Sequence, residues 1–142
     1  MRIGNVGVFV KDLAGARKFF EDYFGATLLK TYNEEENNYY SDILQLDEGA
    51  WIELMTKPEI VDAPKNLNRT GLAHICIKVN SRPELNRIIQ KFKQDGYKIQ
   101  YEPSNPTGGG EVRAVTFEDI VLEVNYTCLL YTSPSPRDST SS

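Results

Sequence analysis

The chain has few residues that could form covalent cross-links and no excess of positive charge. Only two cysteines occur in 142 residues, Cys76 and Cys128, which is too sparse for a disulfide framework. The 16 basic residues are outnumbered by 20 acidic ones, and the formal net charge is -4. Binding to phosphate backbones or anionic membranes needs clustered Lys and Arg. We therefore expect neither nucleic acid nor a membrane among the partners.

Long apolar runs are also missing. No stretch approaches the roughly 18 apolar residues of a membrane span, and residues 1–10 alternate apolar with small residues, as a strand does and a signal peptide does not. The composition is 40% hydrophobic and 25% charged, which is typical of a folded globular protein. Because domains usually contain about 100 to 200 residues, we expect one cytoplasmic domain.

The end of the sequence differs in composition from the rest. Residues 131–142 are rich in Ser, Thr and Pro and lack hydrophobic periodicity, so they cannot bury enough apolar surface to offset their ordering entropy. This segment is also typical of translated cloning or adapter sequence. We assign residues 1–127 to the domain and residues 128–142 to a disordered or cloning-derived tail.

Two segments of the domain share one pattern. Residues 3–10 and 72–79 have strand-like alternation, and Asn5 aligns with His74. An amphipathic helix follows each segment, with apolar residues at helical spacing. The expected N-caps are Asp12 and Ser81, and glycines mark where both helices end, at Gly25 and Gly96.

Three strand-like runs follow each helix. They span about residues 26–32, 39–46 and 50–56 in the first half and 97–101, 112–117 and 120–125 in the second. The last run of each half contains a matched glutamate, Glu53 or Glu123. Such a repeat predicts an α+β fold of two βαβββ modules, about residues 1–57 and 70–127, that form a curved mixed sheet around a shared core.

Strand alternation predicts which way the polar residues of the repeat point. Successive side chains face opposite sides of a strand, so Asn5, Glu53, His74 and Glu123 lie opposite the side that each helix covers. If the modules pack into one curved sheet, these residues converge at the bottom of a cleft, where ligands usually bind. By the same parity the pocket would also include Gln45, Trp51 and Met55.

Simpler roles remain open for several of these residues. A lone strand histidine is usually just hydrogen-bonded in place, and glutamates can be ordinary solvent-side residues of an open sheet. Tryptophan and methionine in strands are more often part of a core. Gly108–Gly110 lacks the Lys and Ser or Thr of a phosphate loop, so a flexible cleft rim is favoured. Arg113, on the following strand, could meet an anionic substrate group.

These motifs resemble those of the vicinal oxygen chelate superfamily, which includes glyoxalases, bleomycin-resistance proteins and dioxygenases. The resemblance covers roughly residues 1–127 and is carried by residues 6–13, 19–25 and 71–75 and by Leu122-Glu123-Val124. It implies a metal held by one side chain from the first and last strand of each half. The implied positions in this sequence are Asn5, Glu53, His74 and Glu123.

Glyoxalase I proteins carry His, Glu or Gln, His and Glu at these four positions, so only Asn5 departs from their pattern. One imidazole and two carboxylates suit Zn, Ni, Co, Mn or Fe, although an amide oxygen is a poorer ligand than imidazole. Such a metal would chelate two adjacent substrate oxygens and stabilise an enediolate. The resemblance assigns the proton-transferring base to Glu123.

Three functions compete. The first is a metal-dependent lyase or isomerase resembling glyoxalase I (lactoylglutathione lyase), acting on a small carbonyl or thiol adduct. The second is a metal-free, bleomycin-resistance type protein that sequesters an aromatic, cationic molecule, which Asn5, Trp51 and the negative net charge favour. A dioxygenase is third, because one histidine per chain cannot form a two-His, one-carboxylate triad. The resemblance also implies a homodimer.

Truncation after Thr127 should leave the melting temperature nearly unchanged, because the composition of the tail offers no core-forming pattern. Thermal denaturation of the two chain lengths, followed by circular dichroism, measures this. A drop of many degrees would instead show that Leu129, Leu130 or Tyr131 packs on the domain.

Overall fold

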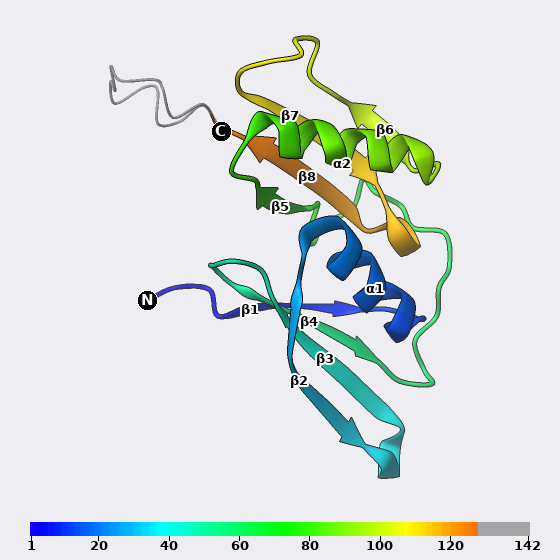
Figure 1. Cartoon of the computed structure of the whole chain (residues 1–142). Coiled ribbons are helices and arrows are strands. Elements are labelled where there is room, and N and C mark those ends of the chain that lie inside the picture. The colour runs from blue at the N-terminus through cyan, green and yellow to red at the C-terminus, as the bar shows by residue number, and fades with distance from the viewer. Residues whose placement is uncertain (128–142) are drawn as a thin grey trace. The chain divides into compact units, whose positions relative to one another are not determined.

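The computed structural model describes residues 1–127, which form two units of similar design (Figure 1). The first unit contains Met1–Arg69 together with Phe117–Ile120, and the second contains Thr70–Thr116 and the residues from Val121 onward. The proposed tail and Cys128 lie outside the described residues, so the assignment of the tail stays a prediction. Within residues 1–127, no helix has the length and apolar character to cross a membrane.

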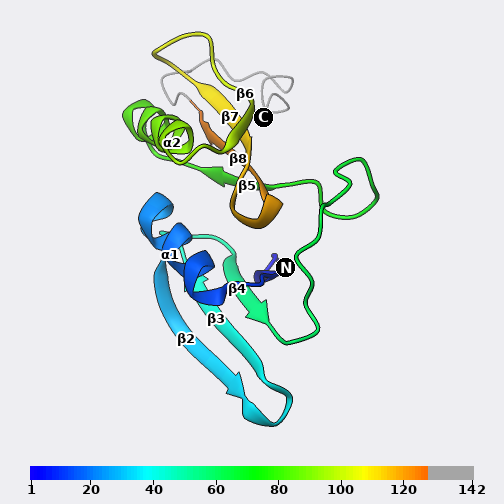
Figure 2. The same cartoon turned by 90° about the vertical axis from the view of Figure 1, so that its right-hand side faces the viewer.

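The first unit is a four-stranded mixed sheet with one helix on one face (Figure 2). Its first and last strands pair in parallel at one end of the order β1-β4-β3-β2, and the remaining neighbours are antiparallel. A short 3-10 helix, η1 (Glu35–Asn37), joins β2 to β3. The elements are β1 (Asn5–Phe9), α1 (Leu13–Phe24), β2 (Thr27–Glu34), β3 (Tyr39–Gln45) and β4 (Trp51–Thr56).

The second unit repeats this topology with the order β5-β8-β7-β6. Here too the first and last strands are parallel, and the helix packs on one face of the sheet. The elements are β5 (Ile75–Lys78), α2 (Arg82–Gln94), β6 (Lys98–Tyr101), β7 (Gly110–Val115) and β8 (Val121–Tyr126). The predicted α+β class and the two βαβββ modules are confirmed, with each module forming a sheet of its own.

Local sequence signals determine where both helices begin. The Asp12 side chain accepts a hydrogen bond from the backbone N–H of Gly15, and the Ser81 hydroxyl accepts one from Glu84. Both predicted N-caps are therefore confirmed. The first helix ends at Gly25, whose φ of 62° lies in the left-handed region that glycine adopts without strain.

The apolar faces of helix and sheet meet in each unit. In α1 the buried residues recur at helical spacing, and alternate apolar residues are buried in the strands behind the helices, such as Ile52 and Leu54 in β4. Burying one such side chain stabilises a fold by roughly 1.5 to 3 kcal/mol. The buried side chains of the helices and of the strands behind them include Phe20, Tyr23, Leu44, Ile52 and Leu54 in the first unit and Leu85, Ile88, Phe92, Val112, Leu122 and Val124 in the second.

The turn between β7 and β8 is tight, as the absence of loop residues predicts, and it belongs to the first unit. It forms the 3-10 segment η2 (Phe117–Asp119). Its Glu118 adopts a left-handed φ of 50°, and its carboxylate accepts hydrogen bonds from the backbone N–H groups of Lys11 (2.6 Å) and Asp12 (2.9 Å). Phe117 stacks on Phe19 of α1, with ring centroids 6.2 Å apart.

Replacing Glu118 by Gln should lower the free energy of unfolding by about 1 kcal/mol, because charge-assisted bonds to two backbone N–H groups become neutral or are lost. Urea denaturation measures the change. Glu48→Gln, in the exposed β3–β4 loop, is the matched control and should stay within about 0.5 kcal/mol of wild type. Equal stability of the Glu118 and Glu48 variants would contradict a role for these bonds.

Candidate functional site

A row of polar side chains crosses the second sheet on the face opposite α2. The strand registers pair Cys76 with Glu123, Glu123 with Arg113, and Arg113 with Tyr101. These residues alternate with the buried positions that face α2, such as Leu122 and Val124. The row therefore follows from strand alternation and register together.

Glu123 lies between a cation and the single histidine. Its Oε2 atom is 3.3 Å from Arg113 Nη1, which donates a hydrogen bond, and 3.3 Å from His74 Nδ1. The Glu123 side chain is 12% exposed, and a carboxylate this buried needs a positive or donating partner. Arg113 supplies that charge.

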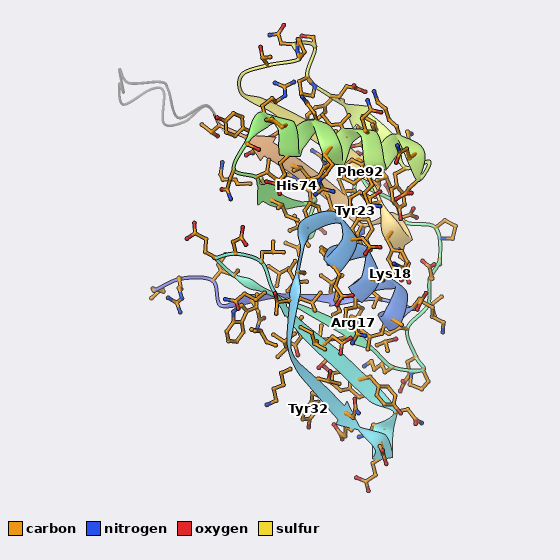
Figure 3. All side chains as sticks on the ribbon, viewed as in Figure 1. Arg17, Lys18, Tyr23, Tyr32, His74 and Phe92 are labelled. Carbon is orange, nitrogen blue, oxygen red and sulfur yellow. The ribbon has the colours of Figure 1, made fainter. Side chains whose placement is uncertain are left out.

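His74 directly precedes β5 and lies beside that strand (Figure 3). Its Nδ1 atom is buried and, within residues 1–127, has no hydrogen-bond partner. Nδ1 and Glu123 Oε2 are therefore in close contact without the alignment of a hydrogen bond. A buried nitrogen beside a carboxylate oxygen is an arrangement that suits a shared cation or proton.

A second polar row lies beside the first. The Asn125 amide is buried; it donates to Glu111 Oε1 (3.3 Å) and Cys76 Sγ (3.4 Å) and accepts from Lys78 Nζ (3.3 Å). The Tyr101 hydroxyl donates to Glu111 Oε2 over 2.5 Å. Desolvation raises the pKa of Tyr101 to about 12, with the hydrogen bond and charge of Glu111 adding to it.

Cys76 is a free thiol within this network. Desolvation raises its pKa, and the negative charges of Glu123 and Glu111 act in the same direction, although Lys78 lowers it. A raised pKa reduces the thiolate fraction and hence nucleophilic reactivity. Cys76 is thus a weak candidate for a catalytic nucleophile.

The first sheet carries the other predicted site residues on its face opposite α1. Asn5 pairs with Trp51, and Glu53 pairs with Gly7. A Cβ atom at Gly7 would lie 2.8 Å from the Met55 Cε atom, so the Met55 side chain covers this glycine. This face is partly apolar and open. Its aromatic side chains are partly exposed, with Phe9 at 52%, Tyr32 at 48% and Trp51 at 41%.

The structure thus groups the candidate residues by unit. His74, Arg113 and Glu123 lie in contact in the second unit, whereas Asn5, Gln45, Glu53, Trp51 and Met55 share one face of the first sheet. Within residues 1–127, no three His, Cys, Asp or Glu side chains form a metal-binding group. The assembly of Asn5, Glu53, His74 and Glu123 around one metal stays a prediction.

The glycine-rich segment Gly108–Gly110, which the sequence suggested as a flexible rim, is bonded to a buried arginine. Arg82, the first residue of α2, is 7% exposed, and its guanidinium donates to the carbonyl oxygens of Asn105, Gly108 (2.9 Å) and Gly109 (3.3 Å). A buried arginine therefore holds the backbone of this loop. Gly110 already belongs to β7.

A family model described as the Glyoxalase/Bleomycin resistance protein/Dioxygenase superfamily matches residues 2–120. The chain belongs to this superfamily. The match includes Asn5, Glu53 and His74 and ends just before β8, the strand that carries Glu123.

One curated protein and several solved structures are similar to this chain. The uncharacterised protein YqjT of Bacillus subtilis is 20% identical over 120 residues, covering 80% of this chain and 86% of YqjT. The trypanothione-dependent glyoxalase I of Leishmania major has a TM-score of 0.70 at 17% identity, covering 87% of this chain and 85% of that one. The fosfomycin resistance protein FosX of Listeria monocytogenes, complexed with Mn(II) and sulfate, has a TM-score of 0.64 at 18% identity, covering 90% and 93%. At these identities the likeness establishes the fold alone.

Glu111→Gln should lower the pKa of Tyr101 towards the ordinary value of 10.0, because the tyrosinate would no longer face a carboxylate. Because the pKa of Tyr101 is higher in the folded than in the unfolded chain, protonated Tyr101 stabilises the wild-type fold. This stabilisation is fully present below about pH 10 and is lost as the pH rises through about 12. The ultraviolet absorbance of tyrosinate, corrected by subtracting the Tyr101→Phe variant, measures the pKa. Ionisation of Tyr101 near pH 10 in the wild type would refute the assignment.

Proposed function

We propose that the chain is a metal-dependent enzyme of the glyoxalase I type, a lyase or isomerase. Its substrate would be a small carbonyl or thiol adduct with two adjacent oxygens. The observation that carries this proposal is the contact between His74 Nδ1 and Glu123 Oε2 on the face of the second sheet opposite α2. The sequence pattern adds Glu53 as a further carboxylate.

The donor chemistry fits a divalent cation such as Zn, Ni, Co, Mn or Fe. His74 offers a buried nitrogen without a hydrogen-bond partner among residues 1–127, and Glu123 offers an adjacent oxygen. Glu53 and Asn5 would complete the set from the first sheet. When bound, the metal would supply Lewis-acid polarisation of the substrate oxygens.

The proposed proton transfer belongs to Glu123. An ionised carboxylate that is largely shielded from water is a competent general base for a carbon acid. In this structure Arg113 donates to its Oε2 atom, and His74 Nδ1 lies 3.3 Å from the same atom, so the carboxylate is already directed towards the proposed metal ligand His74. The Asn5 amide has an N–H donor as well as an oxygen, so it could hold a substrate oxygen in place of ligating the metal.

A metal-free binding protein is the second candidate, and the exposed aromatic side chains of the first sheet favour it. Phe9, Trp51 and Tyr32 lie on the face opposite α1 and are each about half exposed. Aromatic faces bind planar cationic molecules by stacking and cation–π attraction. In this alternative no cofactor is needed, and Arg113 is the permanent partner of Glu123.

We also propose that the protein is a homodimer, on the basis of its superfamily membership. Sedimentation velocity at micromolar concentration tests this proposal. A monomer at that concentration would contradict it.

If the enzyme proposal holds, Glu123→Gln should reduce turnover by about 100-fold or more with little change in melting temperature, because general base catalysis typically contributes that much. The assay follows isomerisation of a panel of small carbonyl–thiol adducts by the metal-loaded protein. The matched control is Glu102→Gln, which removes a carboxylate paired with Lys93 in the same unit and should retain turnover.

Metal content separates the two functions. His74→Ala should lower bound metal after purification without chelator, and Asn5→His should raise metal affinity, since imidazole is a stronger donor than an amide. The enzyme proposal fails if Asn5→His leaves metal binding undetectable while the wild type binds an aromatic cation in the presence of chelator. The binding-protein proposal then replaces it.

A further inference from the structure

The guanidinium of Arg113 lies beside the Glu123 oxygen that a bound metal cation would need. Register pairs the two residues directly across β7 and β8, and Nη1 is 3.3 Å from the same Oε2 atom that His74 contacts. Both side chains are largely shielded, at 28% exposed for Arg113 and 12% for Glu123. The carboxylate therefore already has a counterion supplied by the chain.

We propose that Arg113 is a built-in competitor of the metal for Glu123 and thereby sets the metal affinity of the site. This inference rests on the proposed metal-dependent function and adds its regulation. A divalent ion and a guanidinium repel each other at such short range, and the repulsion is strong where water is largely excluded. Metal binding to Glu123 Oε2 therefore requires Arg113 to release that oxygen.

Arg113 is held in a way that permits release. Within residues 1–127, its buried Nε atom has no hydrogen-bond partner, so the guanidinium uses only part of its five-donor capacity. Arg113 Nη1 donates a hydrogen bond to Glu123. Arg82 is a contrast within the same unit, because its guanidinium is bonded to Asn86 and three backbone carbonyls and has a structural role.

The chain provides a matched control on the same sheet face. Lys78 carries the same charge, but its Nζ donates to Asn125 and not to Glu123. Arg113→Met and Lys78→Met therefore remove one positive charge each, and only the first removes a partner of Glu123. A general electrostatic effect would act on both variants, whereas competition for Oε2 acts on one.

The experiment titrates Mn²⁺, Ni²⁺ and Zn²⁺ separately into the full-length wild type and both variants by calorimetry at fixed ionic strength. Arg113→Met should bind metal about tenfold more tightly than the wild type, which corresponds to about 1.4 kcal/mol. Lys78→Met should stay within about twofold. Arg113→Gln, a smaller perturbation of packing, should also bind more tightly, and thermal melting confirms that each variant is folded.

The outcomes separate this proposal from the proposed function. Metal binding by Arg113→Met but not by the wild type would support the competition. The same result would contradict the proposal that the native protein is metal-dependent. Equal affinity of the wild type and both Arg113 variants would overturn the competition and leave the metal-dependent function standing. An equal gain in Lys78→Met would also overturn it in favour of bulk charge. No binding in any of the proteins would overturn both proposals.

Discussion

The parallel pairing of the first and last strand in each half is the constraint on which the rest of the structure depends. Parallel neighbours cannot be joined by a tight turn, so the chain has to cross over one face of the sheet, and a helix covers that face. The opposite face is left for polar and aromatic side chains. The same pairing places Gly7 beside Glu53 in one unit and Cys76 beside Glu123 in the other.

The repeat makes much of this arrangement predictable from the sequence. Alternation along β8 alone places Glu123 opposite Leu122 and Val124, and short-range capping signals locate both helices. These features depend on neighbours within a few residues. Superfamily membership and the two-module fold follow from the same signals, since they recur in register in both halves.

Contacts across strands are less accessible to sequence reasoning. Simple alternation places Tyr101 on the same side as Ile99, which pairs with the buried Ala114. A bulge between Ile99 and Tyr101 reverses this and brings Tyr101 opposite Arg113. The Tyr101–Glu111 bond could not be foreseen without that bulge. The sheet face on which Arg113 lies likewise follows from its register with Glu123.

The two halves have diverged in the chemistry of their open faces while keeping one topology. The face of the second sheet is ionic, with Arg113, Glu123, Lys78 and Glu111 linked directly or through Asn125. The face of the first sheet carries exposed aromatic side chains, including Phe9 and Trp51, on the same side as Glu53, and a methionine covers Gly7. Duplicated modules can therefore keep the same topology while one sheet carries ionic side chains and the other carries exposed aromatic side chains.

The hydrogen bonds from Arg82 fix the backbone of the β6–β7 loop largely independently of the side chains of that loop. The guanidinium binds main-chain carbonyl oxygens, which every amino acid possesses, so most side chains between residues 104 and 109 are free to change without altering the path of the loop. Gly108 is an exception, because its φ of 83° is one that side-chain-bearing residues rarely adopt, and next to the loop a Cβ atom at Gly110 would lie 2.8 Å from the Pro103 ring. The loop is thus a position where new surface chemistry can evolve, or be engineered, on a backbone that Arg82 and Asn86 of α2 keep in place.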